Sequence, residues 1–122
     1  MGLIVNGGTA IAGGTIAVTV SDSVASNNGA SDPSRGAGFL AQSDVGQAPV
    51  RLTVLRSASA TNPSNGILAF GANARVFVNE SVVFNNASGW LAQSGAVITT
   101  FGNNAVIGNA ANEGAQTSAS LK

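Results

Sequence analysis

The sequence of 122 residues contains no histidine and no cysteine, and its single lysine is the last residue, Lys122. The chain therefore has no imidazole base, no thiolate nucleophile and no zinc or copper site of the ordinary kind, which uses histidine or cysteine. Charged residues make up only 8% of the chain, and the formal net charge is zero. Because a nucleic-acid-binding protein needs a basic face, we expect no nucleic-acid partner.

Long apolar runs are also missing. No uninterrupted apolar stretch approaches the roughly 18 residues that a membrane-spanning helix needs, so we expect no membrane partner. The opening residues, MGLIVNGGTAIAGG, lack the basic flank and the continuous apolar centre of a signal peptide. The compartment stays open: extracellular or cell-surface if a longer parent protein carries a signal, and otherwise cytoplasmic. The absence of cysteine gives no information on the redox environment.

What the sequence does contain is a repeat that aligns in four rows. One column of this alignment holds Val20, Val54, Val78 and Phe101, so the rows are 34, 24 and 23 residues apart. Three further columns hold Ser23, Ser57, Ser81 and Asn104; Val24, Ala58, Val82 and Ala105; and Asn28, Asn62, Asn86 and Asn109. Self-similarity with a period of this length is typical of solenoid proteins.

Within each row the apolar residues alternate, as in Val18 and Val20 or in Val76 and Val78. This period of two predicts β-strands, and no window has the periodicity of a helix. A chain of this length forms one domain, residues 1–122. Short strands, a repeat near 23 residues and glycine or asparagine at each corner predict an all-β fold. We expect a short parallel β-helix of about four to five rungs, with three short strands in each rung.

The repeat also predicts which side chains face inward. The asparagine column should form an internal ladder, because Asn tolerates left-handed corners and its amide can bond to the same amide one rung away. One face of the glycine-led strands has no polar member and should point inward; it carries Phe39, Ile67 and Trp90. The opposite face carries an aliphatic stripe, defined as Ile4, Leu40, Leu68 and Leu91. Two interpretations of this stripe stay open: an exposed contact surface for a second copy, or part of the core.

The repeated pattern V-x-V-x-x-S-x-x-x-x-N, followed by G-x-L-A, resembles the right-handed parallel β-helix, or pectin-lyase-like, fold. The ending FGNNAVIGNAANEGAQTSASLK is similar to the close of many uncharacterised bacterial right-handed β-helix repeat proteins. The resemblance covers residues 2–122 and implies a right-handed coil. The family includes enzymes that act on acidic polysaccharides, alongside non-catalytic binding and surface proteins. In its lyase-like members, clustered carboxylates hold calcium and an arginine or lysine takes a proton.

Asp22, Arg56 and Glu80 share a column, and stacked rungs would place them on the outer face. The trio is either the remnant of a carbohydrate-processing site or a surface ion-pair ladder that avoids stacking like charges. A calcium site needs six or more oxygen ligands, usually with several converging carboxylates, and the whole chain has five carboxylate side chains. We therefore expect a surface ladder and no metal site.

Five other charged residues are candidates for contact with a ligand. Arg51 and Arg75 share a column in adjacent rungs, where they either clamp a carboxylate or sulfate on a sugar or extend separately into water; we expect the second. Two loops inserted in the first row hold Asp32, Arg35 and Asp44. Insertions in solenoids often build the binding face, although aspartate beside proline or glycine is also ordinary turn chemistry.

The scarcity of ionisable side chains and the lack of histidine predict a non-catalytic β-helix module with a structural or interaction role and no cofactor. A short solenoid leaves open strand edges at its ends, so we expect it to self-associate, through those edges or through the aliphatic stripe. The alternative is a polysaccharide-binding module, or a weak lyase- or hydrolase-like enzyme, with a polysaccharide as its partner.

Overall fold

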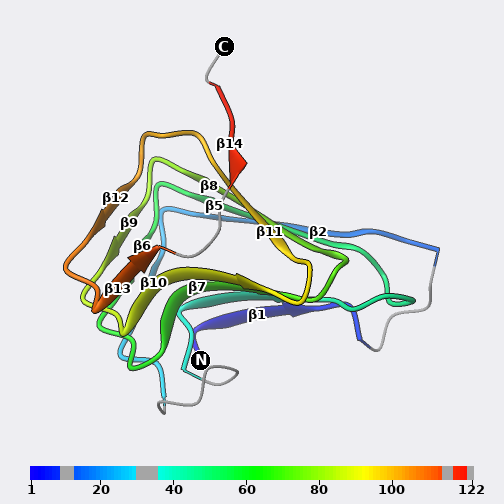
Figure 1. The fold of residues 1–122 in the computed structure, drawn as a ribbon, viewed down its shortest axis with the longest axis horizontal. Coiled ribbons are helices and arrows are strands. Elements are labelled where there is room, and N and C mark those ends of the chain that lie inside the picture. The colour runs from blue at the N-terminus through cyan, green and yellow to red at the C-terminus, as the bar shows by residue number, and fades with distance from the viewer. Residues whose placement is uncertain (9–12, 30–35, 114–116, 121–122) are drawn as a thin grey trace.

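The chain winds into a short parallel β-helix, as its repeat predicts (Figure 1). The computed structural model describes residues 1–8, 13–29, 36–113 and 117–120. Within these ranges the chain forms strands and no helix. Each turn of the coil, or rung, contributes one strand to each of three sheets, and all neighbouring strands run parallel. In Figure 1 the first sheet lies along the bottom, the second along the top and the third on the left.

The three sheets collect every third strand of the chain. The first sheet contains β1 (Leu3–Asn6), β4 (Phe39–Gln42), β7 (Asn65–Phe70), β10 (Ser88–Gln93) and β13 (Ala111–Glu113). The second contains β2 (Ile16–Ser21), β5 (Val50–Leu55), β8 (Ala74–Asn79), β11 (Val97–Thr100) and β14 (Thr117–Ser118). The third contains β3 (Val24–Ser26), β6 (Ala58–Ala60), β9 (Val82–Phe84) and β12 (Ala105–Ile107).

The predicted column of large apolar residues is confirmed for three of its four members. Val20 pairs with Val54 and Val54 with Val78, but the residue opposite Val78 is Thr100. The placement of Phe101 in this column is wrong by one residue. The shift ends at the next strand, where Ala105 pairs with Val82 as the alignment predicts. The last rung therefore carries one extra residue at this corner, where Gly102 adopts a positive φ of 79°.

Left-handed residues turn the chain on both sides of the third sheet. They have positive φ angles between 44° and 54° and stack in two columns: Asp22, Arg56 and Glu80 before the sheet, and Asn27, Thr61 and Asn85 after it. Non-glycine residues adopt this conformation only at a cost, so each corner must be held by its neighbours. All six side chains are exposed, so both columns lie on the outside of the coil.

The asparagine ladder is confirmed inside the corner between the third and first sheets. The backbone N–H and the Nδ2 group of Asn62 both donate to Oδ1 of Asn86, at 3.0 and 2.8 Å. The same pair of bonds joins Asn28 to Asn62, and Asn86 to Asn109. Nδ2 of Asn86 also donates to the backbone oxygen of Ser59 at 3.0 Å. The buried side-chain amides therefore have hydrogen-bond partners, and these bonds hold one rung to the next.

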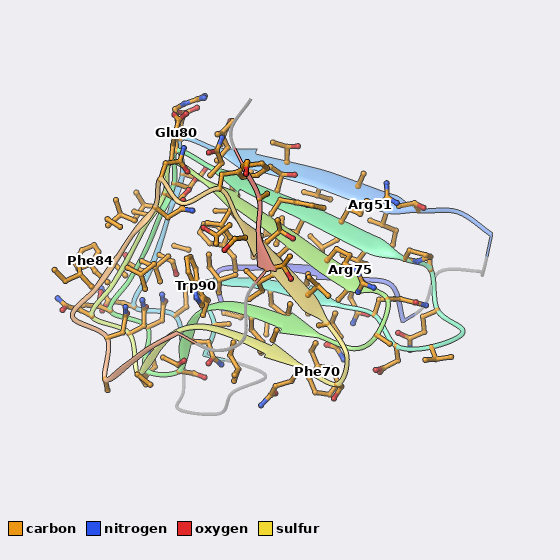
Figure 2. The ribbon with its side chains drawn as sticks, turned by 45° about the horizontal axis from the view of Figure 1, so that its top comes forward. Arg51, Phe70, Arg75, Glu80, Phe84 and Trp90 are labelled. Carbon is orange, nitrogen blue, oxygen red and sulfur yellow. The ribbon has the colours of Figure 1, made fainter. Side chains whose placement is uncertain are left out.

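The interior of the coil is a continuous apolar core. Phe39, Ile67 and Trp90 point into it and are at most 2% exposed, as the sequence predicts. Figure 2 shows Trp90 projecting between the sheets. Its Nε1 atom is buried without a hydrogen-bond partner in the part of the chain that the structure describes.

The aliphatic stripe is not an exposed surface. Leu40 and Leu68 point away from the main core but are only 1% and 2% exposed, because they form a second buried cluster with Ala37. Met1, Phe70 and Leu91 pack against this cluster. The first sheet is therefore covered on both faces in its central rungs, and burial of the leucines follows from the hydrophobic effect. Only Ile4, at 45% exposure, matches the interpretation of an open stripe.

Candidate functional site

The predicted charged column, defined as Asp22, Arg56 and Glu80, lies at the corner between the second and third sheets. The Arg56 side chain makes a two-pronged ion pair with Asp22, with Nε–Oδ1 and Nη2–Oδ2 distances of 2.9 and 2.8 Å. The Arg56 and Asp22 side chains are 50% and 61% exposed. The hydrogen bond from Arg56 lowers the pKa of the Asp22 carboxyl below its usual value. The pKa of Arg56 is raised by Asp22 and, more weakly, by the charge of Glu80.

Glu80 completes this column one rung further along, and Figure 2 shows it projecting from the corner. Its backbone N–H donates to Oδ1 of Asn103 in the next rung at 3.2 Å. The column borders a shallow, open hollow of about 400 Å³, whose other walls include Val24 and Val82. Exposed ion pairs of this kind are screened by water and contribute little to stability. The arrangement is that of an alternating surface ladder.

The arginine pair lies on the outer face of the second sheet, in register on β5 and β8 (Figure 2). Nη1 of Arg75 donates to the backbone oxygens of Ala72 and Ala74, at 2.8 and 2.9 Å. Arg51 is exposed. One guanidinium is therefore held by the turn that precedes its strand, while the other extends into solvent.

Asp44 closes a turn between the first and second sheets. Its backbone N–H donates to Oε1 of Gln47 at 2.8 Å, and its carbonyl oxygen accepts from the backbone N–H of Gln47 at 3.1 Å. Gly46 supplies the positive φ of 82° that this turn requires. Nδ2 of Asn73 in the next rung also donates to the Asp44 carbonyl oxygen, at 3.0 Å. The sequence signal at Asp44 is thus accounted for by turn formation.

Those predicted site residues that the structure describes do not converge on one place. The charged column, the arginine pair and Asp44 lie on different parts of the coil, and Asp32 and Arg35 lie outside the described residues. Among the described residues, no group of three or more His, Cys, Asp or Glu side chains is positioned to hold a metal ion. Among the described candidates, only the three members of the charged column lie together.

Two other surfaces are more prominent, and the sequence singled out only the first of them, as open strand edges at an end of the coil. The first is the open N-terminal end of the coil, where a hollow of about 380 Å³ is lined by nine residues that include Leu3, Val20 and Phe39. The second is the outer face of the third sheet, where Val24 and Ile107 are 73% and 66% exposed. The column that contains Val24 could be read from the sequence, but a three-residue strand gives too short an alternation to show which way it faces.

The part of the chain that the structure describes contains no helix long and apolar enough to cross a membrane. Comparison with known proteins finds no matching family model, no matching curated protein and no matching solved structure.

Proposed function

We propose that this protein is a non-catalytic β-helix repeat module, of the pectin-lyase-like kind, with a structural role: it stacks end to end with further copies of itself. The observation that carries the proposal is the open N-terminal end. There β1, β2 and β3 are the outermost strands of their three sheets, and each pairs with a neighbour on one side only among the described strands. Unpaired strand edges around a hollow that Leu3, Val20 and Phe39 help to line favour the addition of further strands.

The apolar side chains of the first rung support this proposal. Ile16, Val18 and Val20 point into the coil from β2, yet they remain partly exposed, whereas Leu52 and Val76 beneath Val18 are fully buried. A further rung placed over the first would remove this apolar surface from water, and about 25 cal/mol is gained for each Å² buried.

The polarity of the asparagine ladder favours head-to-tail stacking. Asn28, Asn62 and Asn86 each donate the backbone N–H and Nδ2 to the Oδ1 atom of the asparagine in the next rung towards the C-terminus. The first rung therefore presents the acceptor, Asn28 Oδ1, at the open end. Two N-terminal ends placed face to face would bring acceptor against acceptor. A head-to-tail contact is not closed by symmetry and generates a filament.

A proline in the edge strand tests the proposal. The N–H groups of Ile16 and Asp22 donate towards β5, so in a parallel strand the alternate N–H of Thr19 points to the open edge. Thr19→Pro removes a donor and leaves the pairing with β5 intact. Sedimentation velocity of the full chain should show stacked species that Thr19→Pro abolishes and Thr19→Ala retains. A chain that stays monomeric at all concentrations, or stacking that survives Thr19→Pro, contradicts the proposal.

Polysaccharide binding is the second candidate, and one observation favours it. Arg51 and Arg75 lie side by side on a regular sheet face, with Thr53 and the half-buried Phe77 in the next row. Guanidinium groups beside an aromatic ring are suited to an acidic sugar. A glycan array probed with and without calcium tests this candidate, and loss of the signal in Arg51→Ala would support it. Absence of binding to every acidic glycan would discard it.

A further inference from the structure

The outer face of the third sheet is almost entirely apolar. The middle residue of each strand points inward, as the burial of Ala25, Ser59 and Val83 shows, and the first and third residues alternate to the outer side. The outward residues form two rows across four rungs: Val24, Ala58, Val82 and Ala105, and Ser26, Ala60, Phe84 and Ile107. We call these eight residues the apolar face. Figure 2 shows Phe84 projecting from it.

Most of this surface is exposed in the single chain, although Ala60 is only 5% exposed. Val24, Val82 and Ile107 are 73%, 40% and 66% exposed, and they are three of the five large exposed hydrophobic residues among those described. Isolated apolar side chains on a surface are ordinary, but seven apolar residues in two stacked rows form one continuous patch. Such a patch indicates a contact surface.

We infer that the apolar face binds the same face of a second copy. A two-fold axis, parallel to the strands and midway between β6 and β9, relates the two copies, so that their coil axes are antiparallel. This rotation reverses the order of the rungs. It places Val24 opposite Ala105 of the second copy, and Val82 opposite Ala58. It likewise places Ile107 opposite Ser26, and Phe84 opposite Ala60. Each large side chain meets a small one, as two interdigitating sheet faces require.

The charged column gives the same orientation independently. The column borders the apolar face, since Asp22, Arg56 and Glu80 line the same shallow hollow as Val24 and Val82. Arg56 precedes β6 and Glu80 precedes β9, so they lie in the two rungs on either side of the axis. The rotation therefore sets Arg56 opposite Glu80 of the second copy, and symmetry repeats this pair. A pairing that kept the rungs in the same order would instead set the charged column against the uncharged corner of Asn27, Thr61 and Asn85.

The size of the face sets the strength of the contact. Four strands about 4.8 Å apart, with two outward residues each, bury well under the roughly 800 Å² per partner of a stable complex. The dimer is therefore weak and forms only at high protein concentration. It leaves both ends of the coil open, so it does not depend on end-to-end stacking, and Thr19→Pro leaves it unchanged.

The first test uses a matched pair of lysine substitutions in the full chain. Val82→Lys places a charge at the centre of the apolar face, and Val45→Lys changes a valine that is 82% exposed in a turn outside it. Sedimentation equilibrium, from about 10 μM to about 1 mM, should show that Val82→Lys weakens dimerisation at least about tenfold and that Val45→Lys leaves it unchanged. Circular dichroism checks that both variants fold. Equal dimerisation of the two variants, or a monomer at every concentration, overturns the inference.

The second test exchanges the charges. Arg56→Glu sets two carboxylates against each other across the contact and should weaken the dimer, and the double variant Arg56→Glu, Glu80→Arg should restore it. Concentration-dependent changes in amide NMR shifts should fall on β3, β6, β9 and β12. Failure of the double variant to restore dimerisation, or shifts confined to the first rung, overturns the antiparallel contact and leaves end-to-end stacking as the mode of association.

Discussion

At the scale of single residues, the asparagine ladder explains why a polar side chain occupies the inside of the coil. Asn86 is 3% exposed, and its amide both accepts and donates: Oδ1 accepts from Asn62, and Nδ2 donates to Ser59 and Asn109. A buried polar group costs free energy only when it lacks partners. The ladder therefore specifies the register of successive rungs at little cost in stability.

Removal of one amide from the ladder should lower the free energy of unfolding substantially. Asn86→Ala removes the acceptor of the backbone N–H of Asn62, and it takes one bond each from Nδ2 of Asn62 and from the carbonyl oxygen of Ser59, all in a buried place. We expect a loss of about 2–4 kcal/mol in the free energy of unfolding, measured by urea denaturation. Asn79→Ala is the matched control, because it removes only an exposed bond to Asn103 and should cost less than about 0.5 kcal/mol. Equal losses in the two variants would contradict the role of the ladder.

The charged column should respond to acid. Arg56 lowers the pKa of the Asp22 carboxyl, so the stabilisation from this pair is present at neutral pH and is lost as the pH falls through that lowered value. Arg56→Gln should return the pKa of Asp22 upward to its usual range, as followed by an NMR titration of the Asp22 side chain. The unfolding midpoint at neutral pH should change little, because both side chains are exposed. An Asp22 titration that is the same in both proteins would show that the pair does not persist in solution.

At the scale of strands and corners, the glycines that lead the first-sheet strands mark places where two rungs and the ladder meet. A methyl group added at Gly66 would lie 2.5 Å from the carbonyl oxygen of Gly89 and 2.8 Å from Nδ2 of Asn86. No side chain fits there, because the neighbouring rung and the asparagine amide already fill the space. The glycine is therefore a consequence of the ladder.

This close approach predicts a specific cost for a single added methyl group. Gly66→Ala should lower the free energy of unfolding by about 1–3 kcal/mol, since backbone must shift to make room. Gly14→Ala is the control, because a methyl group there would contact nothing within 4 Å; it should be neutral or slightly stabilising. Thermal unfolding of both variants makes the comparison. A harmless Gly66→Ala would mean that the rungs pack more loosely at this corner than the structure shows.

The comparison of strands with sequence shows what a repeat can and cannot predict. Side chains that stack like on like leave a column in the sequence, so the asparagine and valine columns and the inward face of Trp90 were predicted correctly. The placement of Phe101 was not, because an extra residue at a corner can be assigned to either side of it. The sequence did not show whether Leu40 and Leu68 are exposed or buried, because a strand covered on both faces has no alternation of polar and apolar residues.

For the candidate site, the sequence predicted only that its three charged residues share one alignment column. The shared position of Asp22, Arg56 and Glu80 follows from the repeat, but alignment gives no side-chain geometry and could not show the two bonds between Arg56 and Asp22. The apolar face went unrecognised because Val82 and Phe84 flank one inward residue in a strand of only three. In a strand that short, inward and outward residues look the same in composition.

At the scale of the whole molecule, the coil is well packed in the middle and open at its beginning. One column of the second sheet shows this gradient: Val18, Leu52, Val76 and Ile98. Leu52, Val76 and Ile98 are fully buried, and Val18 remains partly exposed because no described rung covers it. In a solenoid each rung touches only its neighbours, so an end rung receives about half the packing of a central one.

The same substitution should therefore have unequal effects along this column. Val76→Ala opens a cavity between two rungs and should cost about 2–3 kcal/mol, whereas Val18→Ala at the open end should cost less than about 1 kcal/mol. Urea denaturation at low protein concentration, where copies are separate, makes this comparison. If copies stack end to end, Val18 becomes buried and the cost of Val18→Ala should rise with protein concentration, while the cost of Val76→Ala stays constant. Equal costs at low concentration would show that the first rung is already covered, and would remove the physical reason for the coil to add further rungs.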